Sequence, residues 1–331
     1  MLIRIISLVI LSGIINFSFI TNVKADIFIF PQKKPSVFKD ITAVKKITPK
    51  EKPAIKNGDF VYPRSKNVKK IDEIKHLTVR KLIKYSKIKS GLEIHYDGDL
   101  PARSGMGSSS SFSVGLMRAL YNYQNKDIKG INLAHKTIFF EQKIMKETVG
   151  SQDQVAASVG GFNKISFLKN DNIIVKKILS ENLKKLNSNL LLLYTGIQRN
   201  ADAVASNYVH KLSNEKEKNV RNIISNVELG EKMIKSGNIN DFGKLLHHAW
   251  IEKKELSSSI SNHKIDELYQ TSIQNGALGG KLLGAGGGGF LLVYMKKEKQ
   301  KKFLSKIKNI TNIPFKFSNE GCDIILNTLN K

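Results

Sequence analysis

The chain has 331 residues, 41% of them hydrophobic, and a single cysteine, Cys322. This composition provides enough apolar material for two packed domains, and it excludes a fibre, a wholly disordered chain, an internal disulfide and a thiolate metal cluster. The formal net charge is +26, from 54 Lys and Arg against 28 Asp and Glu. Lysines are spread along the chain without a basic-aromatic RNA motif, so we do not expect nucleic acid as a partner.

The first 25 residues are typical of a secretory signal. Arg4 precedes an apolar run from Ile5 to Ile20, and Val23-Lys-Ala25 supplies the small residues of a cleavage site. A fortuitous apolar strand is the alternative interpretation. If this segment is not cleaved, it is the one part of the chain that we expect to contact a membrane.

Residues 26–69 are predicted to form a tether. They contain a loose Pro/Lys repeat, PQKKP, PKEKP and PRSKN. Because such a stretch cannot bury a core, we expect it to be extended and solvated.

A glycine- and serine-rich loop follows the first strand predicted in the chain body, at 92–96. Two glycines in the loop, Gly105 and Gly107, permit a tight turn, and the serines offer hydroxyl and N–H groups where an apolar helical pattern begins. A flexible linker is the alternative, but a linker needs no amphipathic helix behind it. The loop therefore predicts a site for a nucleotide phosphate. Its candidate residues are Pro101, Ser104, Gly105, Met106, Gly107, Ser108, Ser109 and Ser110.

Two acidic residues further along the chain are candidates for chemistry. Glu141 lies in a helix predicted over 131–147, where a carboxylate among bulky apolar side chains needs a partner. Asp153 could cap the helix that begins near Gln154, act chemically, or do both. Glu147 is a weaker alternative to Glu141.

The remaining pattern mixes strands and helices, which predicts an α+β fold. Strands are predicted at 163–168, 173–178, 190–194 and near 290 and 315, and helices at 114–123, 198–211, 214–235, 240–256 and 264–275. No carboxylate or Cys completes a metal set around His247 and His248, so we expect them to pack on their helix or face the solvent.

A second glycine cluster runs from Gly279 to Gly289. It contains a G-x-G-x-x-G match, but a dinucleotide fingerprint follows a strand and opens a helix, whereas this cluster follows a helix and precedes a strand. Without a ligand it would be a glycine bend. Three basic residues near the two clusters suit either a phosphate or the solvent: Arg103, Arg199 and Lys281.

These motifs resemble those of the GHMP kinases, the superfamily of galactokinase, homoserine kinase and mevalonate kinase. The second family motif is a Pro, three residues and Gly-Leu-Gly-Ser-Ser, and Met106 replaces the Leu here. Six segments occur in an order similar to the D-glycero-D-manno-heptose 7-phosphate kinase branch: IDEIKH, DLPARSGMGSSSSFSVGL, GSQDQVAASVGGFN, LLLYTGIQRNA, LSSSISNHKIDELY and GALGGKLLGAGGGGFLL.

The resemblance implies ATP and Mg²⁺ as cofactors and assigns roles to individual residues. Asp153 matches the family aspartate that takes the proton from the acceptor hydroxyl, and Glu141 with Ser109 matches the Mg²⁺ ligands. The glycine cluster matches the third family motif, which lies beside the phosphate loop. The implied substrate contacts are Arg199, Gly284, Gly286 and Gly287.

The resemblance also implies a two-domain fold with the site between the domains. We expect a ribosomal-S5-like N-terminal domain at 70–180, incomplete here, and a ferredoxin-like C-terminal domain at 181–331. The first family motif, of the type Arg-x-x-Phe-Gly-Gly-Gly-Thr-Asp, has no counterpart in this chain. The signal-like leader and the tether stand in its place.

Three functions follow from this interpretation. The first is phosphorylation of a sugar hydroxyl, with the anomeric hydroxyl of D-glycero-D-manno-heptose 7-phosphate favoured. The second is another small-molecule kinase, for a hexose or an isoprenoid precursor, and the third is an inactive binding module. ATP chemistry implies the cytoplasm, whereas the leader implies export, and the sequence gives no indication of an oligomeric state.

Overall fold

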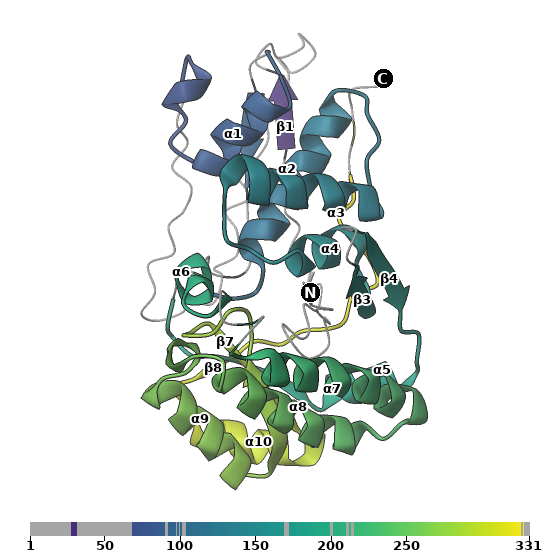
Figure 1. Cartoon of the computed structure of the whole chain (residues 1–331), viewed down its shortest axis with the longest axis vertical. Coiled ribbons are helices and arrows are strands. Elements are labelled where there is room, and N and C mark those ends of the chain that lie inside the picture. The colour runs from purple at the N-terminus through teal and green to yellow at the C-terminus, as the bar shows by residue number, and fades with distance from the viewer. Residues whose placement is uncertain are drawn as a thin grey trace, which may run out of the picture.

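The computed structural model describes residues 28–31, 68–89, 92–96, 98, 100, 104–168, 172–198, 201–209, 212, 215–325 and 327. The N-terminal half of the chain forms the upper part of the molecule in Figure 1, and the C-terminal half forms the lower part. The predicted leader lies outside the described residues, as does most of the predicted tether.

The upper part is built around the helix α2, Ser108–Tyr123, which buries Val114, Leu116 and Leu120 completely. Three helices pack around it: α1, Leu77–Tyr85, α3, Gly130–Phe139, and α4, Gln152–Val159. A short 3₁₀ turn, Ile71–Glu73, precedes α1. The apolar stripe of α2 therefore forms the core of this half, as its periodicity predicts.

One helix predicted at 131–147 is interrupted in the structure. Residues 130–139 form α3, and Phe140–Met145 continue as a π-type turn that ends at Lys146 with φ 61°. Glu141 lies inside this turn and is 1% exposed. π-type turns are rare and are frequently found at functional sites, so this turn supports Glu141 as a candidate functional residue.

Two small antiparallel sheets flank these helices. The strand β2, Leu92–His95, pairs with β1, Phe28–Pro31, and β3, Asn163–Phe167, pairs with β4, Ile173–Lys177. The predicted tether, which we expect to be extended and solvated, is instead a paired strand at residues 28–31. This sequence, FIFP, is rich in aromatic and β-branched residues, which favour a strand once a partner edge is available.

The lower part contains a four-stranded antiparallel sheet in the order β6-β7-β5-β8. Its strands are β5, Leu190–Tyr194, β6, Ala277–Leu282, β7, Phe290–Met295, and β8, Thr311–Asn312. Helices separate β5 from β6, a glycine turn joins β6 to β7, and α10, Lys297–Lys306, precedes β8. This order and connectivity are those of the expected ferredoxin-like domain.

Both faces of the central strands are buried. Leu190 and Leu192 belong to one core cluster with side chains of α7, Glu217–Ser236, and α8, Ile239–Lys254. Leu191 and Leu193 point the other way, into a second cluster with α9, His263–Gln274, and α10. Continuous apolar runs in β5 and β7 are the sequence signature of this two-sided burial. The remaining short elements are α5, Asn182–Ser188, α6, Ala201–Ser206, and a 3₁₀ turn, Ser258–Ile260.

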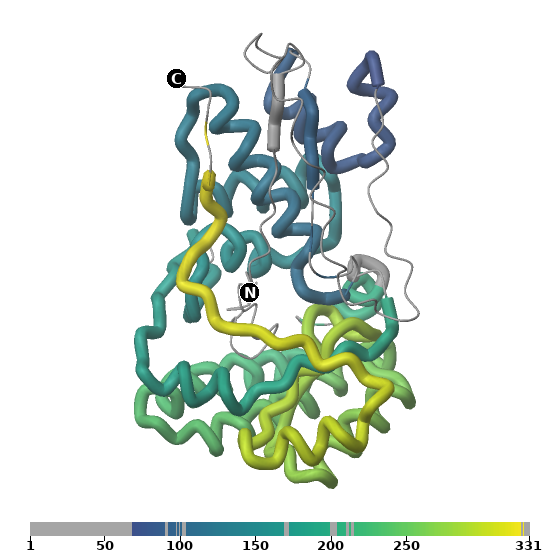
Figure 2. The backbone as a smooth tube through the Cα atoms, turned by 180° about the vertical axis from the view of Figure 1, so that it is seen from behind, coloured from purple at the N-terminus to yellow at the C-terminus, as the bar shows by residue number. Residues whose placement is uncertain are grey.

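The C-terminal segment after β8 returns to the upper part, as the yellow tube in Figure 2 shows. We call residues 313–323 the return segment. Asn187 holds its middle, because the side-chain amide donates to Phe315 O at 3.2 Å and accepts from Phe317 N at 3.0 Å. Its end is held by α4, where Cys322 N donates to Ala157 O at 2.8 Å. A strand near 315 was predicted, but regular pairing ends at Asn312.

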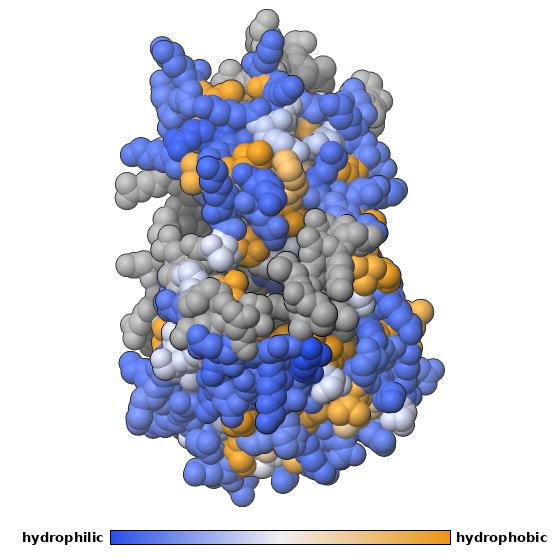
Figure 3. Space-filling model, in the orientation of Figure 1, coloured by the Kyte–Doolittle hydropathy of each residue, from blue (hydrophilic) through white to orange (hydrophobic). Residues whose placement is uncertain are grey.

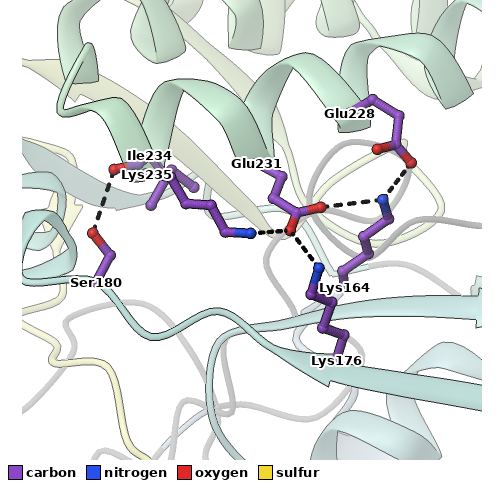
Figure 4. Close-up of polar contacts among 7 residues, drawn as sticks. All are labelled: Lys164, Lys176, Ser180, Glu228, Glu231, Ile234 and Lys235. Atoms are coloured by element: carbon purple, nitrogen blue, oxygen red, sulfur yellow. Dashed lines mark hydrogen bonds and ion pairs between the residues drawn. The ribbon is translucent and has the colours of Figure 1, made fainter.

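A cluster of charged side chains makes a second connection between the halves (Figure 4). Glu231 of α7 is 6% exposed and pairs with Lys164 of β3 at 3.1 Å, Lys176 of β4 at 3.2 Å and Lys235 at 2.6 Å. Lys164 also pairs with Glu228. The β3–β4 hairpin is thereby fixed to α7.

One face of the molecule is drawn with its side chains coloured by hydropathy in Figure 3. Described side chains on the face drawn in Figure 3 are mostly hydrophilic, with apolar residues in small groups. Within the part of the chain that the structure describes, helices are too short or too polar to cross a membrane.

Candidate active site between the two glycine motifs

The predicted phosphate loop ends in the first turn of α2. Gly107 is the N-cap residue of this helix and has φ 67°, a left-handed conformation that favours glycine. The helix begins at Ser108, six residues earlier than predicted, so the serines form its first turn. The first N–H groups of a sixteen-residue helix point toward this end, which suits an anion.

Ser104 occupies the start of the loop and is fully buried. Its hydroxyl oxygen has no hydrogen-bond partner among the described residues. Met106, two residues on, packs against the core cluster of α7 and α8. The loop thus contacts the lower part of the molecule through apolar packing.

The second glycine cluster lies against the phosphate loop, as the resemblance implies. A Cβ atom at Gly289, where φ is 95°, would lie 1.9 Å from the carbonyl oxygen of Ser104. Thr195 holds the same glycine, because its N–H and hydroxyl both donate to Gly289 O, at 2.9 and 2.8 Å. The backbones of three separate segments therefore meet at this point.

The three glycines predicted to contact substrate lie in the turn between β6 and β7. Their visible neighbours are protein groups: Gly287 N donates to Ile260 O at 2.8 Å, and a Cβ at Gly286 would lie 2.7 Å from the Cα of Ile260. Gly284 O accepts a hydrogen bond from Lys253 Nζ. Close packing explains the choice of glycine at 286, and a role toward substrate stays a prediction for all three.

Asp153 lies beside the N-cap of α2. A Cβ atom built on Gly107 would be 3.1 Å from both the carboxyl carbon and Oδ2 of Asp153. A carboxylate therefore lies next to the N-terminal end of α2. Asp153 is the second residue of α4, whose N-cap is Ser151, so the alternative prediction that Asp153 caps this helix is wrong, and its chemical role stays a prediction.

Glu141 is placed next to Ser110 rather than Ser109. The Ser110 hydroxyl donates to Glu141 Oε2 at 3.0 Å and is buried, whereas Ser109 is exposed. The predicted pairing with Ser109 is corrected on this point: because the helix begins at Ser108, a shift of one residue rotates a side chain by about 100°. Glu147, the weaker alternative, donates its N–H to Glu141 O at 3.0 Å.

The oxygen atoms around Glu141 fit a small divalent cation. Glu141 Oε1 is buried and has no hydrogen-bond partner within the described part of the chain. Carboxylate and hydroxyl oxygens are ligands that Mg²⁺ accepts, usually with several waters and nucleotide phosphates completing the shell. Among the described residues, no group of three or more His, Cys, Asp and Glu is placed to hold a metal ion.

Several predicted contacts lie outside the described residues: Pro101, Arg103 and Arg199. Lys281 is described and is fully buried in β6, so it is not a surface lysine. Burial, with the nearby charge of Lys253, holds the pKa of Lys281 well below its usual range. His247 packs as expected, with Nδ1 2.6 Å from the Tyr269 hydroxyl, and burial lowers its pKa.

Two polar residues of the site were not predicted. Lys253 is 3% exposed and donates to Leu282 O at 3.3 Å and to Gly284 O, which holds the start of the glycine turn. Gln154 is fully buried and donates to Glu141 Oε2. A signal for Gln154 exists in the sequence, because it is a polar residue directly before the apolar run Val155-Ala-Ala.

Comparison with known proteins agrees with this geometry. Residues 72–161 match the GHMP kinases N terminal domain and residues 231–311 match the GHMP kinases C terminal domain, together more than half of the chain. A D-glycero-alpha-D-manno-heptose 7-phosphate kinase of Campylobacter jejuni is 29% identical over 261 residues, 76% of each chain. A mevalonate kinase of Methanocaldococcus jannaschii is 28% identical over 223 residues, 66% of each chain.

A solved structure shares the fold. The crystal structure of a D-glycero-D-manno-heptose 1-phosphate kinase from Bacteroides thetaiotaomicron aligns with a TM-score of 0.58 at 22% identity, over 74% of this chain and 71% of that chain. With both domain matches, the sheet order and the two adjoining glycine motifs in place, this chain belongs to the GHMP kinases, a family of ATP-dependent phosphotransferases.

Proposed function

We propose that this chain is an ATP- and Mg²⁺-dependent sugar kinase whose acceptor is the anomeric hydroxyl of D-glycero-D-manno-heptose 7-phosphate. One observation carries the proposal: the carboxylate of Asp153 lies against Gly107, at the N-terminal end of α2. A candidate base and a helix terminus suited to anions thus share one position, and each can serve phosphoryl transfer.

In this proposal the N–H groups at the start of α2 hold the nucleotide phosphates. Asp153 accepts the proton of the sugar hydroxyl as its oxygen bonds to the γ-phosphorus of ATP and the bond from that phosphorus to the β-phosphate oxygen breaks, releasing ADP.

The cation is assigned to Glu141 and Ser110, whose oxygen atoms lie 3.0 Å apart. When bound, Mg²⁺ neutralises charge on the transferred phosphoryl group. Glu141 Oε1 is the oxygen offered to the cation, since Oε2 already accepts two hydrogen bonds.

The acceptor is assigned by similarity and by position. The heptose 7-phosphate kinase relative is similar over three quarters of both chains. Arg199 follows the Thr195 turn that binds Gly289, so we assign it to the 7-phosphate, and we assign Gly284, Gly286 and Gly287 to the sugar side of the site.

The test is an acceptor panel with the full chain. ADP release is measured with Mg-ATP and, in turn, D-glycero-D-manno-heptose 7-phosphate, galactose and mevalonate. We expect release with the heptose phosphate alone. Release with galactose or mevalonate would assign another GHMP acceptor, and a folded chain that binds ATP without any release would be a binding module.

A further inference from the structure

The first turn of α4 presents two neighbouring side chains to two different parts of the site. Asp153 lies against Gly107 of the phosphate loop, and Gln154 donates a hydrogen bond to Glu141. Consecutive residues on a helix point about 100° apart, so one short turn reaches both places. The predicted base and a partner of the predicted metal ligand are therefore fixed to the same rigid backbone.

Glu141 receives its two hydrogen bonds on a single oxygen. Ser110 Oγ and Gln154 Nε2 both donate to Oε2, while Oε1 has no partner among the described residues. All three side chains are at most 5% exposed. Two donors on one oxygen fix the rotation of the carboxylate and leave Oε1 as the oxygen available to a cation.

Gln154 carries a second buried acceptor without a hydrogen-bond partner. Its own Oε1 is buried and lacks a hydrogen-bond partner in the described part of the chain. A buried acceptor without a partner costs about 1–3 kcal/mol. Both unmet groups, on Glu141 and on Gln154, are acceptor oxygens, and a hydrated cation is a species that satisfies acceptors.

We propose that Gln154 is a positioning residue for metal binding: it holds Glu141 in the orientation that ligates the cation, and it fixes the distance from that cation to Asp153. The proposal rests on the proposed function, because it assigns Gln154 to the same site. Removing a side chain that hydrogen-bonds to a metal ligand typically lowers the metal affinity by about 10- to 100-fold.

The test compares Gln154→Met with Gln152→Met. Methionine keeps the length and volume of glutamine but removes the amide, and Gln152 is a half-buried glutamine in the same turn. The measurement is the dissociation constant of Mn²⁺, by electron paramagnetic resonance, in the full chain saturated with a non-hydrolysable ATP analogue. Circular dichroism melting checks that each variant is folded.

We expect Gln154→Met to weaken Mn²⁺ binding by at least about tenfold and Gln152→Met to leave it unchanged. In a Glu141→Gln background, Gln154→Met should have no further effect, because it acts through Glu141. If Gln154→Met does not fold, Gln154→Asn takes its place, since it keeps a buried amide that is one methylene too short to reach Glu141.

Equal Mn²⁺ affinity in the wild-type chain and in a folded Gln154 variant would overturn this proposal alone. Absence of Mn²⁺ binding by the wild-type chain with the ATP analogue would overturn the proposed function as well. A weakening that persists in full in the Glu141→Gln background would show that Gln154 does not act through Glu141, and would overturn the positioning role.

Discussion

The Cα of Gly289 lies so close to Ser104 that an added Cβ would come within 1.9 Å of the Ser104 carbonyl oxygen. This contact brings the two glycine motifs together, although 184 residues lie between Ser104 and Gly289 in the sequence. Backbone rather than side chain forms the contact on both sides, so only glycine fits at position 289.

We predict that Gly289→Ala destabilises the chain by more than about 2 kcal/mol, because it combines a steric clash with φ 95°. The matched control is Gly130→Ala, where φ is also positive, 55°, but nothing lies within 4 Å of the added Cβ. Urea unfolding of both variants measures the difference. Equal losses of unfolding free energy in the two variants would mean that Gly289 and Ser104 are not in close contact in solution.

The Glu231 cluster predicts a loss of stability in acid. The pKa of Glu231 is lowered to about 2, mainly by the hydrogen bond from Lys235 and further by Lys164 and Lys176, while burial acts in the opposite direction. Because the folded pKa lies below the unfolded value of 4.5, the stabilisation is complete above that value and is lost as the pH falls toward 2.

Glu231→Gln should therefore cost about 2 kcal/mol of unfolding free energy near pH 7, and the cost should shrink below about pH 4.5. Glu228→Gln is the control, since Glu228 pairs with the same Lys164 but is 58% exposed, and we expect it to cost less than about 1 kcal/mol. Urea unfolding at a series of pH values tests both. A cost for Glu231→Gln that does not change with pH would contradict the ionic origin.

The return segment should open locally when Asn187 is shortened. Asn187→Ala removes both hydrogen bonds to Phe315 and Phe317, which we expect to speed hydrogen exchange of the Cys322 amide at the far end of the segment. Ser188→Ala, at an exposed neighbouring position, should leave that exchange rate unchanged. Unchanged protection at Cys322 in Asn187→Ala would show that α4 holds the segment without help from Asn187.

Local sequence patterns predicted the parts of the site that lie within one motif. The loop at 104–110, the burial of Glu141 and the strands β5 and β7 follow from glycine placement and apolar runs, whereas β6 was not predicted. Which serine faces Glu141 depends on the helix start at Ser108, and the family resemblance that pointed to Ser109 carries no information about this boundary.

Contacts between distant segments were not predictable in the same way. Lys164 meets Glu231, and Cys322 meets Ala157, only because the chain returns across both halves. A single lysine or glutamate in a chain with 82 charged residues carries no signal of its partner. The pairing of β1 with β2 was not predictable for the same reason, because the strand at 28–31 forms only against the edge of a strand much later in the chain.

The central claim is that Asp153 removes the proton from a sugar acceptor, and Asp153→Asn tests it most directly. We would measure ADP release with Mg-ATP and D-glycero-D-manno-heptose 7-phosphate, with ATP binding followed by calorimetry. The predicted result is heptose-dependent release that falls by about a hundredfold to ten-thousandfold in Asp153→Asn while ATP affinity is kept. Heptose-dependent release at the same rate in wild type and Asp153→Asn would contradict the account.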